Sequence, residues 1–452
     1  MSTAFADIDL RVQITNRQIL NITLPIAVSI LVPQINFITN NIFLSGLGEQ
    51  PLAVAGITGV FYLIFAVMGF GLNNGLQALI ARRAGENRIS EISGLFNQGV
   101  RIALVFALLG IGIVYFVAPV IFKMSLINNS DAQIAIKFLF IRIWGLPLLY
   151  MFQIRNALLV GVNQSKYLII GTLTETLTNI FFDYSLIYGH FGFPQMGFNG
   201  AAVASIIAEA AGFFTVFIVL RWKGISKKLQ LAGNLAYNAF NTKLILKQSS
   251  PLILQFFISV TSWEFFYILI EHHGERDLAI SNIMRNIFGL FGCISWAFAA
   301  ASNTMVSNII GQGLQDRVIE LIVKIMKLSV SFAIIIFFLI NIAPQVLLKI
   351  YGQNDDFINA AVPVVRIVSA ALILMSVSTV WLNAVTGTGN TRINLLIEIF
   401  AITLYCIYAY VVLQKLFLSI TIGWAAEWLY WILVFIPSFF YIKSGRWKGK
   451  RI

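Results

Sequence analysis

The chain repeats itself at a fixed distance of 226 residues, which is half of its 452-residue length. The sequence GEQPLA at residues 48–53 corresponds to GERDLA at 274–279. Further along, GVNQSK at 161–166 corresponds to GTGNTR at 387–392. Because one offset holds across segments that have otherwise diverged, the sequence predicts two structurally equivalent halves.

Long apolar runs place both halves in a membrane. Residues 102–122, 328–348 and 395–413 each contain at least roughly 18 mostly apolar residues, enough for a helix to cross about 30 Å of hydrocarbon. The chain is 58% hydrophobic and 11% charged, and it lacks the alternation typical of strands. We therefore predict an all-α integral membrane protein. Cys293 and Cys406 both lie in apolar runs, which predicts neither a disulfide framework nor a metal site.

Hydropathy predicts twelve transmembrane helices in two six-helix lobes. An even number of spans per half orients both halves the same way, so we expect a pseudo-two-fold axis along the membrane normal, an arrangement typical of transporters. The expected domains are an N-lobe at 1–221, a polar cytoplasmic linker at 222–245 and a C-lobe at 246–452. The predicted spans are 18–45, 52–83, 93–122, 131–160, 166–189, 198–221, 246–270, 277–311, 318–348, 357–386, 392–414 and 420–443.

Basic residues set the expected orientation. They gather in alternate connections, such as the one after the second span and the linker, whereas residues 46–51 and 190–197 contain none. The positive-inside rule then places both termini in the cytoplasm of a multi-pass protein, which we expect in the plasma membrane (the inner membrane of a bacterium). The formal charge of +12 is dispersed over several short loops, and this argues against nucleic acid as a partner.

The chemistry is expected at the few ionisable groups inside the bilayer, because each costs a few kcal/mol there unless it has a partner or a function. Asp183 lies deep in the fifth predicted span, and Asn179 precedes it by one helical turn. This spacing puts an amide and a carboxylate on one helix face, which suits binding of a proton or of Na⁺. The alternative, equally favoured, is a structural hydrogen bond between helices worth about 1 kcal/mol.

Glu264 is a second candidate, in the middle of the seventh predicted span, where the first half has Ile38. A carboxyl group without a counterpart indicates a candidate site in the C-lobe, and a protonated carboxyl bonded to the helix backbone is an equally supported alternative. Arg142 and Arg366 occupy similar places in the fourth and tenth spans, so we expect them to share a packing or lipid-anchoring role. Four further acids are expected to be structural or interfacial: Glu175, Glu209, Glu398 and Glu427.

Three sets of spaced motifs resemble the multidrug and toxin extrusion (MATE) family, and the resemblance covers the whole chain. It implies twelve helices in two lobes around a central cavity, and efflux of drugs or organic cations driven by inward H⁺ or Na⁺, with no cofactor besides the coupling ion. The motifs are LP, NNIF, GLG and LAVAG at 24–25, 40–43, 46–48 and 52–56, then DYSLIYG and GFNGAA at 183–189 and 197–202, and finally GTGNT at 387–391.

The resemblance also implies roles for single residues. Asp183 and Asn179 match the family's cation-coupling pair, and Ser205 matches a hydroxyl position in the sixth span. Pro25 matches the proline at which the first span bends. Asn40 stands where many members have an aspartate, so Asp183 is left as the only formal charge of this site.

The C-lobe acids of one subgroup have no match here. Ser259 or Ile258 falls near the first of them and roughly Met375 near the second, and Glu264 is the candidate substitute. We therefore expect coupling in the N-lobe, by alternating access. Ion binding at Asp183 bends the first span at Pro25 and displaces the substrate outward.

Two other functions fit the sequence less well. A flippase for lipid-linked oligosaccharides or cell-wall precursors shares this architecture but would more often carry several Arg or Lys residues inside the spans. An enzyme would need a nucleophile and base, or metal-spaced His, within the membrane, and the three His residues are all predicted in loops. The expected partners are a small amphipathic or cationic substrate, which the many aromatic side chains could contact, and membrane lipid. The expected state is a monomer.

Overall fold

The all-α prediction is confirmed. The computed structural model describes residues 10–126, 128–233, 236–351 and 354–450, and these residues form helices joined by short turns, without a strand. Eleven helical segments of this described part are long and apolar enough to cross a membrane.

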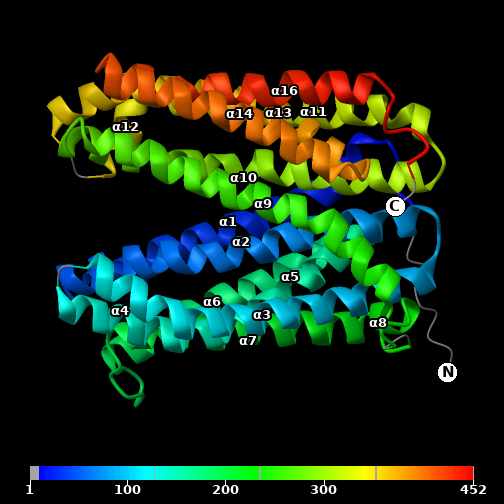
Figure 1. Ribbon diagram of the computed structural model, residues 1–452, viewed down its shortest axis with the longest axis horizontal. Helices are drawn as coiled ribbons and strands as arrows, with labels where there is room; N and C mark the ends of the chain where they lie inside the picture. Colours follow the sequence, from blue (N-terminus) through cyan, green and yellow to red (C-terminus); the bar gives the residue numbers. More distant parts are fainter. Residues whose placement is uncertain (1–9, 127, 234–235, 352–353, 451–452) are drawn as a thin grey trace. The chain divides into compact units, whose positions relative to one another are not determined.

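The chain separates into two compact units. The first contains Val28–Ser249 and the second contains Arg11–Ala27 and Ser250–Ile452, so α1 and α9 each contribute residues to both. Within each unit the long helices run side by side (Figure 1). The helices of the first half are α1 (Asn16–Ser45), α2 (Glu49–Gly85), α3 (Ile89–Ser125), α4 (Asn129–Arg142), α5 (Leu146–Gly161), α6 (Leu168–Tyr188) and α7 (Phe198–Trp222), with 3₁₀ turns η1 (Ile143–Gly145) and η2 (Ser165–Tyr167).

A short helix, α8 (Ile225–Lys228), lies in the predicted linker, and α9 begins seven residues before the predicted seventh span. The remaining helices are α9 (Ala239–Glu271), α10 (Glu275–Gly311), α11 (Val318–Ile342), α12 (Pro344–Lys349), α13 (Asp355–Gly387), α14 (Thr391–Tyr410), α15 (Ile420–Gly423) and α16 (Ala426–Lys443), with η3 (Gln315–Arg317) and η4 (Val411–Lys415).

The turns of the two halves are built alike. Helices α2 and α10 each contain 37 residues and begin 226 positions apart. Gly48 precedes α2 with φ 108° and Gly274 precedes α10 with φ 111°. A side chain is strongly disfavoured at such positive φ, so glycine is needed at both places. The repeated glycines in the sequence therefore mark two equivalent turns.

One span is broken in the first half and continuous in the second. The predicted span 131–160 forms α4, the turn η1 and α5, whereas its counterpart is the single helix α13. Pro147, near the start of α5, has no backbone N–H and so cannot donate the hydrogen bond that would continue α4 into α5. The second half has Ile373 at the equivalent position, and Ile373 can donate this bond. The predicted span 318–348 likewise ends early, at Ile342, because the residue before Pro344 leaves the helical conformation.

Helix α6 corresponds to the predicted fifth span but is not among the eleven most apolar segments. It carries Glu175, Asn179 and Asp183, together with four threonines, and these lower its hydropathy. The fifth predicted span is thus a helix of the first unit that is rich in polar residues.

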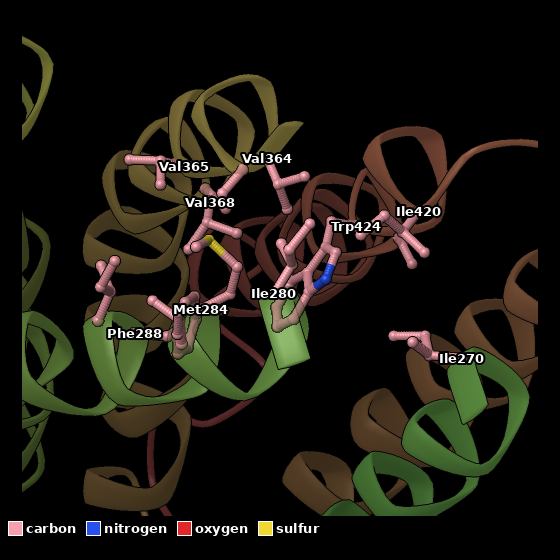
Figure 2. Close-up of a cluster of buried hydrophobic side chains, with 14 of the residues drawn as sticks. Ile270, Ile280, Met284, Phe288, Val364, Val365, Val368, Ile420 and Trp424 are labelled. Atoms are coloured by element: carbon pink, nitrogen blue, oxygen red, sulfur yellow. The ribbon is translucent and has the colours of Figure 1, made fainter. Parts of the chain in front are cut away.

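The second unit has a large apolar core. Its cluster includes Met284 and Phe288 of α10, Val365 and Val368 of α13, and Trp424 at the end of α15. Figure 2 shows these side chains gathered between the helices. Branched and aromatic side chains fill the space between the helices of this unit and hold them against one another.

Candidate functional site

Asp183 and Asn179 lie together inside the first unit. The Asp183 side chain is 0% exposed and that of Asn179 is 3% exposed. The two residues are four apart on α6, so they lie on one face of the helix, with Glu175 one turn before them. The structure thus buries both members of the predicted pair.

Helix α1 lies beside this face of α6. The Asn36 side-chain amide donates a hydrogen bond of 2.7 Å to the side-chain oxygen of Asn179. Seven residues further along α1, the Phe43 carbonyl accepts a hydrogen bond of 2.6 Å from the Tyr188 hydroxyl. The two helices therefore run in the same direction here, and their register puts Asn40 level with Asp183. Sequence reasoning missed Asn36, although its position four residues before Asn40 was a usable signal.

This cluster contains four acceptor oxygens that are buried and have no hydrogen-bond partner among the described residues. They are both carboxylate oxygens of Asp183 and the side-chain oxygens of Asn36 and Asn40. Burying a carboxylate without a partner is costly, and a bound cation or proton removes that cost. Oxygens of this kind are also the ligands that hard cations prefer. The arrangement can therefore hold a proton or a small cation such as Na⁺.

Helix α7 packs closely on α6 from another side. A side chain at Gly200 would lie 2.7 Å from the Leu186 carbonyl oxygen, and one at Gly212 would lie 3.1 Å from Glu175. These two contacts fix an antiparallel register in which Ala204 lies opposite Asp183. Ser205 is the next residue, and its hydroxyl donates to the Ala201 carbonyl of its own helix at 2.9 Å. A role of Ser205 in ion coupling stays a prediction.

A buried ion pair lies in the same unit. The Arg142 guanidinium donates to both carboxylate oxygens of Glu209, at 2.5 and 3.1 Å, and stacks 4.1 Å from the Tyr62 ring centre. The expectation that Arg142 and Arg366 share a role is wrong, because Arg366 is exposed on α13. Sequence spacing could not show this pair, since its two members lie 67 residues apart.

The remaining predicted residues lie elsewhere. Pro25 lies in α1, which is helical without a break from Asn16 to Ser45, so bending at this proline stays a prediction. Glu264 is half-buried on α9. The deeply buried acids of the second unit are instead Glu398 and Glu427, with 1% and 2% exposure. Among the described residues, no cluster of three His, Cys, Asp or Glu side chains could hold a metal ion.

Solved structures with the same fold are transporters. An outward-facing conformation of a multidrug resistance MATE family transporter of the MOP superfamily is 18% identical, with a TM-score of 0.85 and coverage of 96% of this chain and 97% of that one. A MOP superfamily transporter from Pyrococcus furiosus, described as having a binding pocket of reverse polarity that suggests a different function, is 16% identical, with a TM-score of 0.86 and coverage of 95% and 96%.

Sequence comparison gives the family. A probable multidrug resistance protein NorM from Synechocystis sp. is 22% identical over 405 residues, and the match covers 86% of each chain. The MatE family profile matches twice, at residues 25–185 and 251–411, and the two matches are again 226 residues apart. They cover more than half of the chain, one in each half. This protein therefore belongs to the MatE family of membrane transporters.

Proposed function

We propose that the chain is a secondary active exporter of small amphipathic or cationic molecules, including drugs, driven by inward movement of H⁺ or Na⁺. Membership of the MatE family supports transport. Export of drugs is supported by the NorM relative, which is described as a probable multidrug resistance protein. The Pyrococcus furiosus transporter has the same fold and is described as having a binding pocket that suggests a different function, so the proposal rests on the site and not on the fold.

The observation that carries the proposal is the buried, unpartnered carboxyl group of Asp183. Its two oxygens and those of Asn36 and Asn40 lack hydrogen-bond partners among the described residues, although all are buried. Such a group is stabilised when a cation or proton binds to it and is destabilised again when the ion leaves. A reversible change of this kind is what an ion-coupled carrier needs.

The contacts around Asp183 indicate how ion binding could drive movement. Asn36 and Asn40 belong to α1, and Asn179 and Asp183 belong to α6. An ion or proton at Asp183 attracts the oxygens of both helices and changes the hydrogen bonding between them. We propose that α1 then bends at Pro25, that the cavity of the first half shrinks and that the substrate is displaced outward.

The same proposal includes a topology and a state of assembly. Basic residues in alternate connections favour both termini in the cytoplasm of a plasma-membrane protein. We propose a monomer as the working transporter.

A proteoliposome assay tests the proposal. Purified protein is reconstituted, a pH or Na⁺ gradient is imposed, and transport of a panel of cationic dyes is followed. The wild type should transport dye under one of the two gradients. Asp183→Asn keeps the shape of the side chain but removes its charge, so gradient-driven transport should fall to the level of protein-free liposomes.

Asp355→Asn is the matched control, because it makes the same chemical change at an exposed residue of α13. It should transport dye like the wild type. Wild-type transport by Asp183→Asn would remove Asp183 from the mechanism, and failure of every dye under both gradients would refute export of cationic drugs.

A flippase for pyrophosphate-linked lipids is less well supported by the same structure. The Arg142 guanidinium is committed to Glu209, and Arg155 lies 3.7 Å over the Phe213 ring. These two cations thus have partners inside the first unit and are poorly placed to hold a pyrophosphate.

A further inference from the structure

A second buried polar cluster occurs in the second unit, on α9, α14 and α16. Its centre is Glu398, whose carboxylate is almost fully buried. One carboxylate oxygen accepts hydrogen bonds from the Ser259 hydroxyl, at 2.8 Å, and from the Tyr430 hydroxyl. Neither the family match nor the proposed function gives this cluster a role.

The cluster reproduces the chemistry of the Asp183 site on a different pair of helices. Asn394 and Glu398 are four residues apart on α14, as Asn179 and Asp183 are on α6. The Asn394 amide donates 2.5 Å to the Gln255 side-chain oxygen, and Gln255 is four residues before Ser259 on α9. Each site therefore combines an amide and an acid on one helix with two polar residues, spaced one turn apart, on its neighbour.

The two clusters are nevertheless not repeat counterparts. The fixed offset of 226 residues relates Asn179 and Asp183 to Tyr405 and Ala409. The amide and acid of the second unit lie 11 residues earlier on α14, which is about three helical turns. The second cluster is thus a separate arrangement, and divergence of an inherited copy at the equivalent position does not explain it.

Two buried oxygens of the second cluster have no hydrogen-bond partner among the described residues. They are the other carboxylate oxygen of Glu398 and the side-chain oxygen of Asn394. A hard metal cation is usually surrounded by about six oxygens. Two oxygens are too few for such an ion, but a proton on Glu398 needs only one acceptor. The donors Ser259 and Tyr430 already occupy the first carboxylate oxygen.

Tyr430 of α16 is the titratable group in direct contact with Glu398 among the described residues. Two further titratable groups lie around Tyr430. Glu427, on α16, accepts a 3.1 Å hydrogen bond from Trp431, and Tyr405, on α14, has its ring centre 5.9 Å from that of Tyr430. The contacting residues of α9 are uncharged. None of these described groups supplies a positive charge that would hold Glu398 permanently ionised.

We propose that Glu398 is a second proton-binding site, which takes up and releases a proton reversibly within the second unit. The free oxygens of Glu398 and Asn394 hold the proton, and Ser259 and Tyr430 orient the carboxyl group. This proposal goes beyond the coupling at Asp183 and does not depend on it, since the two groups belong to different units.

Infrared difference spectroscopy of the purified protein tests the proposal without a substrate or a gradient. Spectra recorded at low and high pH reveal any carboxyl group that exchanges a proton, through its C=O stretching band, which shifts in D₂O. The wild type should show one band that is absent from Glu398→Gln and retained in Asp183→Asn. Glu271→Gln is the matched control, because Glu271 is exposed at the end of α9.

Identical difference spectra for the wild type and Glu398→Gln would overturn the proposal, because a carboxyl group that is always protonated or always ionised gives no pH-dependent band. Tyr430→Phe decides the matter if Glu398→Gln fails to fold. This variant removes one donor to the carboxyl group, so it should shift the Glu398 band, and an unshifted spectrum would count against the proposal.

Sodium provides the last arm of the test. The titration is repeated with all Na⁺ replaced by N-methylglucamine at equal ionic strength. The Glu398 band should stay the same. A band that disappears when Na⁺ is added would show that a metal ion binds there, and this outcome would also overturn the proposal.

Discussion

The pair α1–α6 and the pair α9–α14 occupy equivalent places in the two halves, yet their interiors differ in chemistry at the level of Asp183. In the first pair, Asn40 is level with Asp183, and both have unpartnered oxygens. In the second pair the corresponding residues are Phe266 and Ala409. The Phe266 ring centre lies 5.7 Å from that of Tyr405, in a tilted arrangement, and 5.3 Å from that of Trp424, edge to face, within the apolar core of the second unit.

This difference shows which parts of the repeat are constrained. The turns must keep glycine at Gly48 and Gly274, because the backbone there has a positive φ. The helix interiors need only fill space or satisfy their polar groups. In the second half, aromatic side chains fill this position and are stabilised by dispersion contacts. In the first half, polar oxygens at the same position remain available to an ion.

The first prediction concerns a second place where one half is charged and the other half is apolar. The ion pair Arg142–Glu209 corresponds, at the offset of 226, to Val368 and Phe435. Arg142→Ala leaves Glu209 buried without a partner, so it should reduce stability by about 3–5 kcal/mol. The measurement is thermal unfolding of detergent-purified protein, followed by Trp fluorescence.

Arg366→Ala is the control, and it should leave the unfolding temperature unchanged because Arg366 is exposed. The double variant Arg142→Val with Glu209→Phe copies the second half. It should recover most of the lost stability, since apolar side chains of similar volume often replace a buried ion pair without loss. A double variant as unstable as Arg142→Ala would show that the halves differ in packing as well as in charge.

The sequence predicted the fold well because apolar periodicity and turn glycines are local signals. The twelve spans correspond to helices or helix pairs of the structure, and two of the breaks that were missed occur beside a proline. Pro147 lies just after the break between α4 and α5, and Pro344 ends α11 early. Both prolines are visible in the sequence, but whether a given proline kinks, breaks or is tolerated depends on its neighbours in space.

The site was predicted less completely. Asp183 and Asn179 could be found because they are polar residues one turn apart in an apolar span. Asn36 was missed although it precedes Asn40 by one helical turn. Glu209, the partner of Arg142, could not be found, because the pair is defined by packing between helices far apart in the chain. Glu264 was chosen for its place in the middle of a span, whereas the structure buries Glu398 more deeply, and depth along a span is not the same as burial in protein.

The second prediction exchanges the chemistry of the two equivalent positions. Ala409→Asp puts a carboxyl group into the apolar core of the second unit, where it meets Phe266 and Tyr405. It should reduce stability by about 3 kcal/mol, and the amount of folded protein recovered from membranes should fall. Asp183→Ala removes a carboxyl group that has no hydrogen bond, so it should leave stability unchanged or raise it while transport is lost.

Thermal unfolding and size-exclusion profiles of the two variants make the comparison. The expected result is opposite signs: Ala409→Asp is destabilised and Asp183→Ala is not. Equal destabilisation would mean that Asp183 has a structural role in the first unit, and the case for a dedicated ion site there would weaken.

The last prediction concerns the prolines that the two halves share, and its effect is the smallest. The division between the two units crosses α1 soon after Pro25 and crosses α9 just before Pro251. In Pro25→Ala, residue 25 has a backbone N–H that can donate a hydrogen bond within the helix, and this bond makes bending harder. Dye transport should become about 3–10-fold slower, which corresponds to roughly 1 kcal/mol in the barrier, while the preference for H⁺ or Na⁺ stays the same.

Pro251→Ala makes the same change in α9 and should alter the initial transport rate by less than Pro25→Ala, because we place ion coupling at Asp183, beside α1. The comparison needs equal amounts of reconstituted protein, checked by Trp fluorescence. If Pro251→Ala slows transport more strongly than Pro25→Ala does, the helix that moves belongs to the second half. The placement of ion coupling at Asp183, beside α1, would then be wrong.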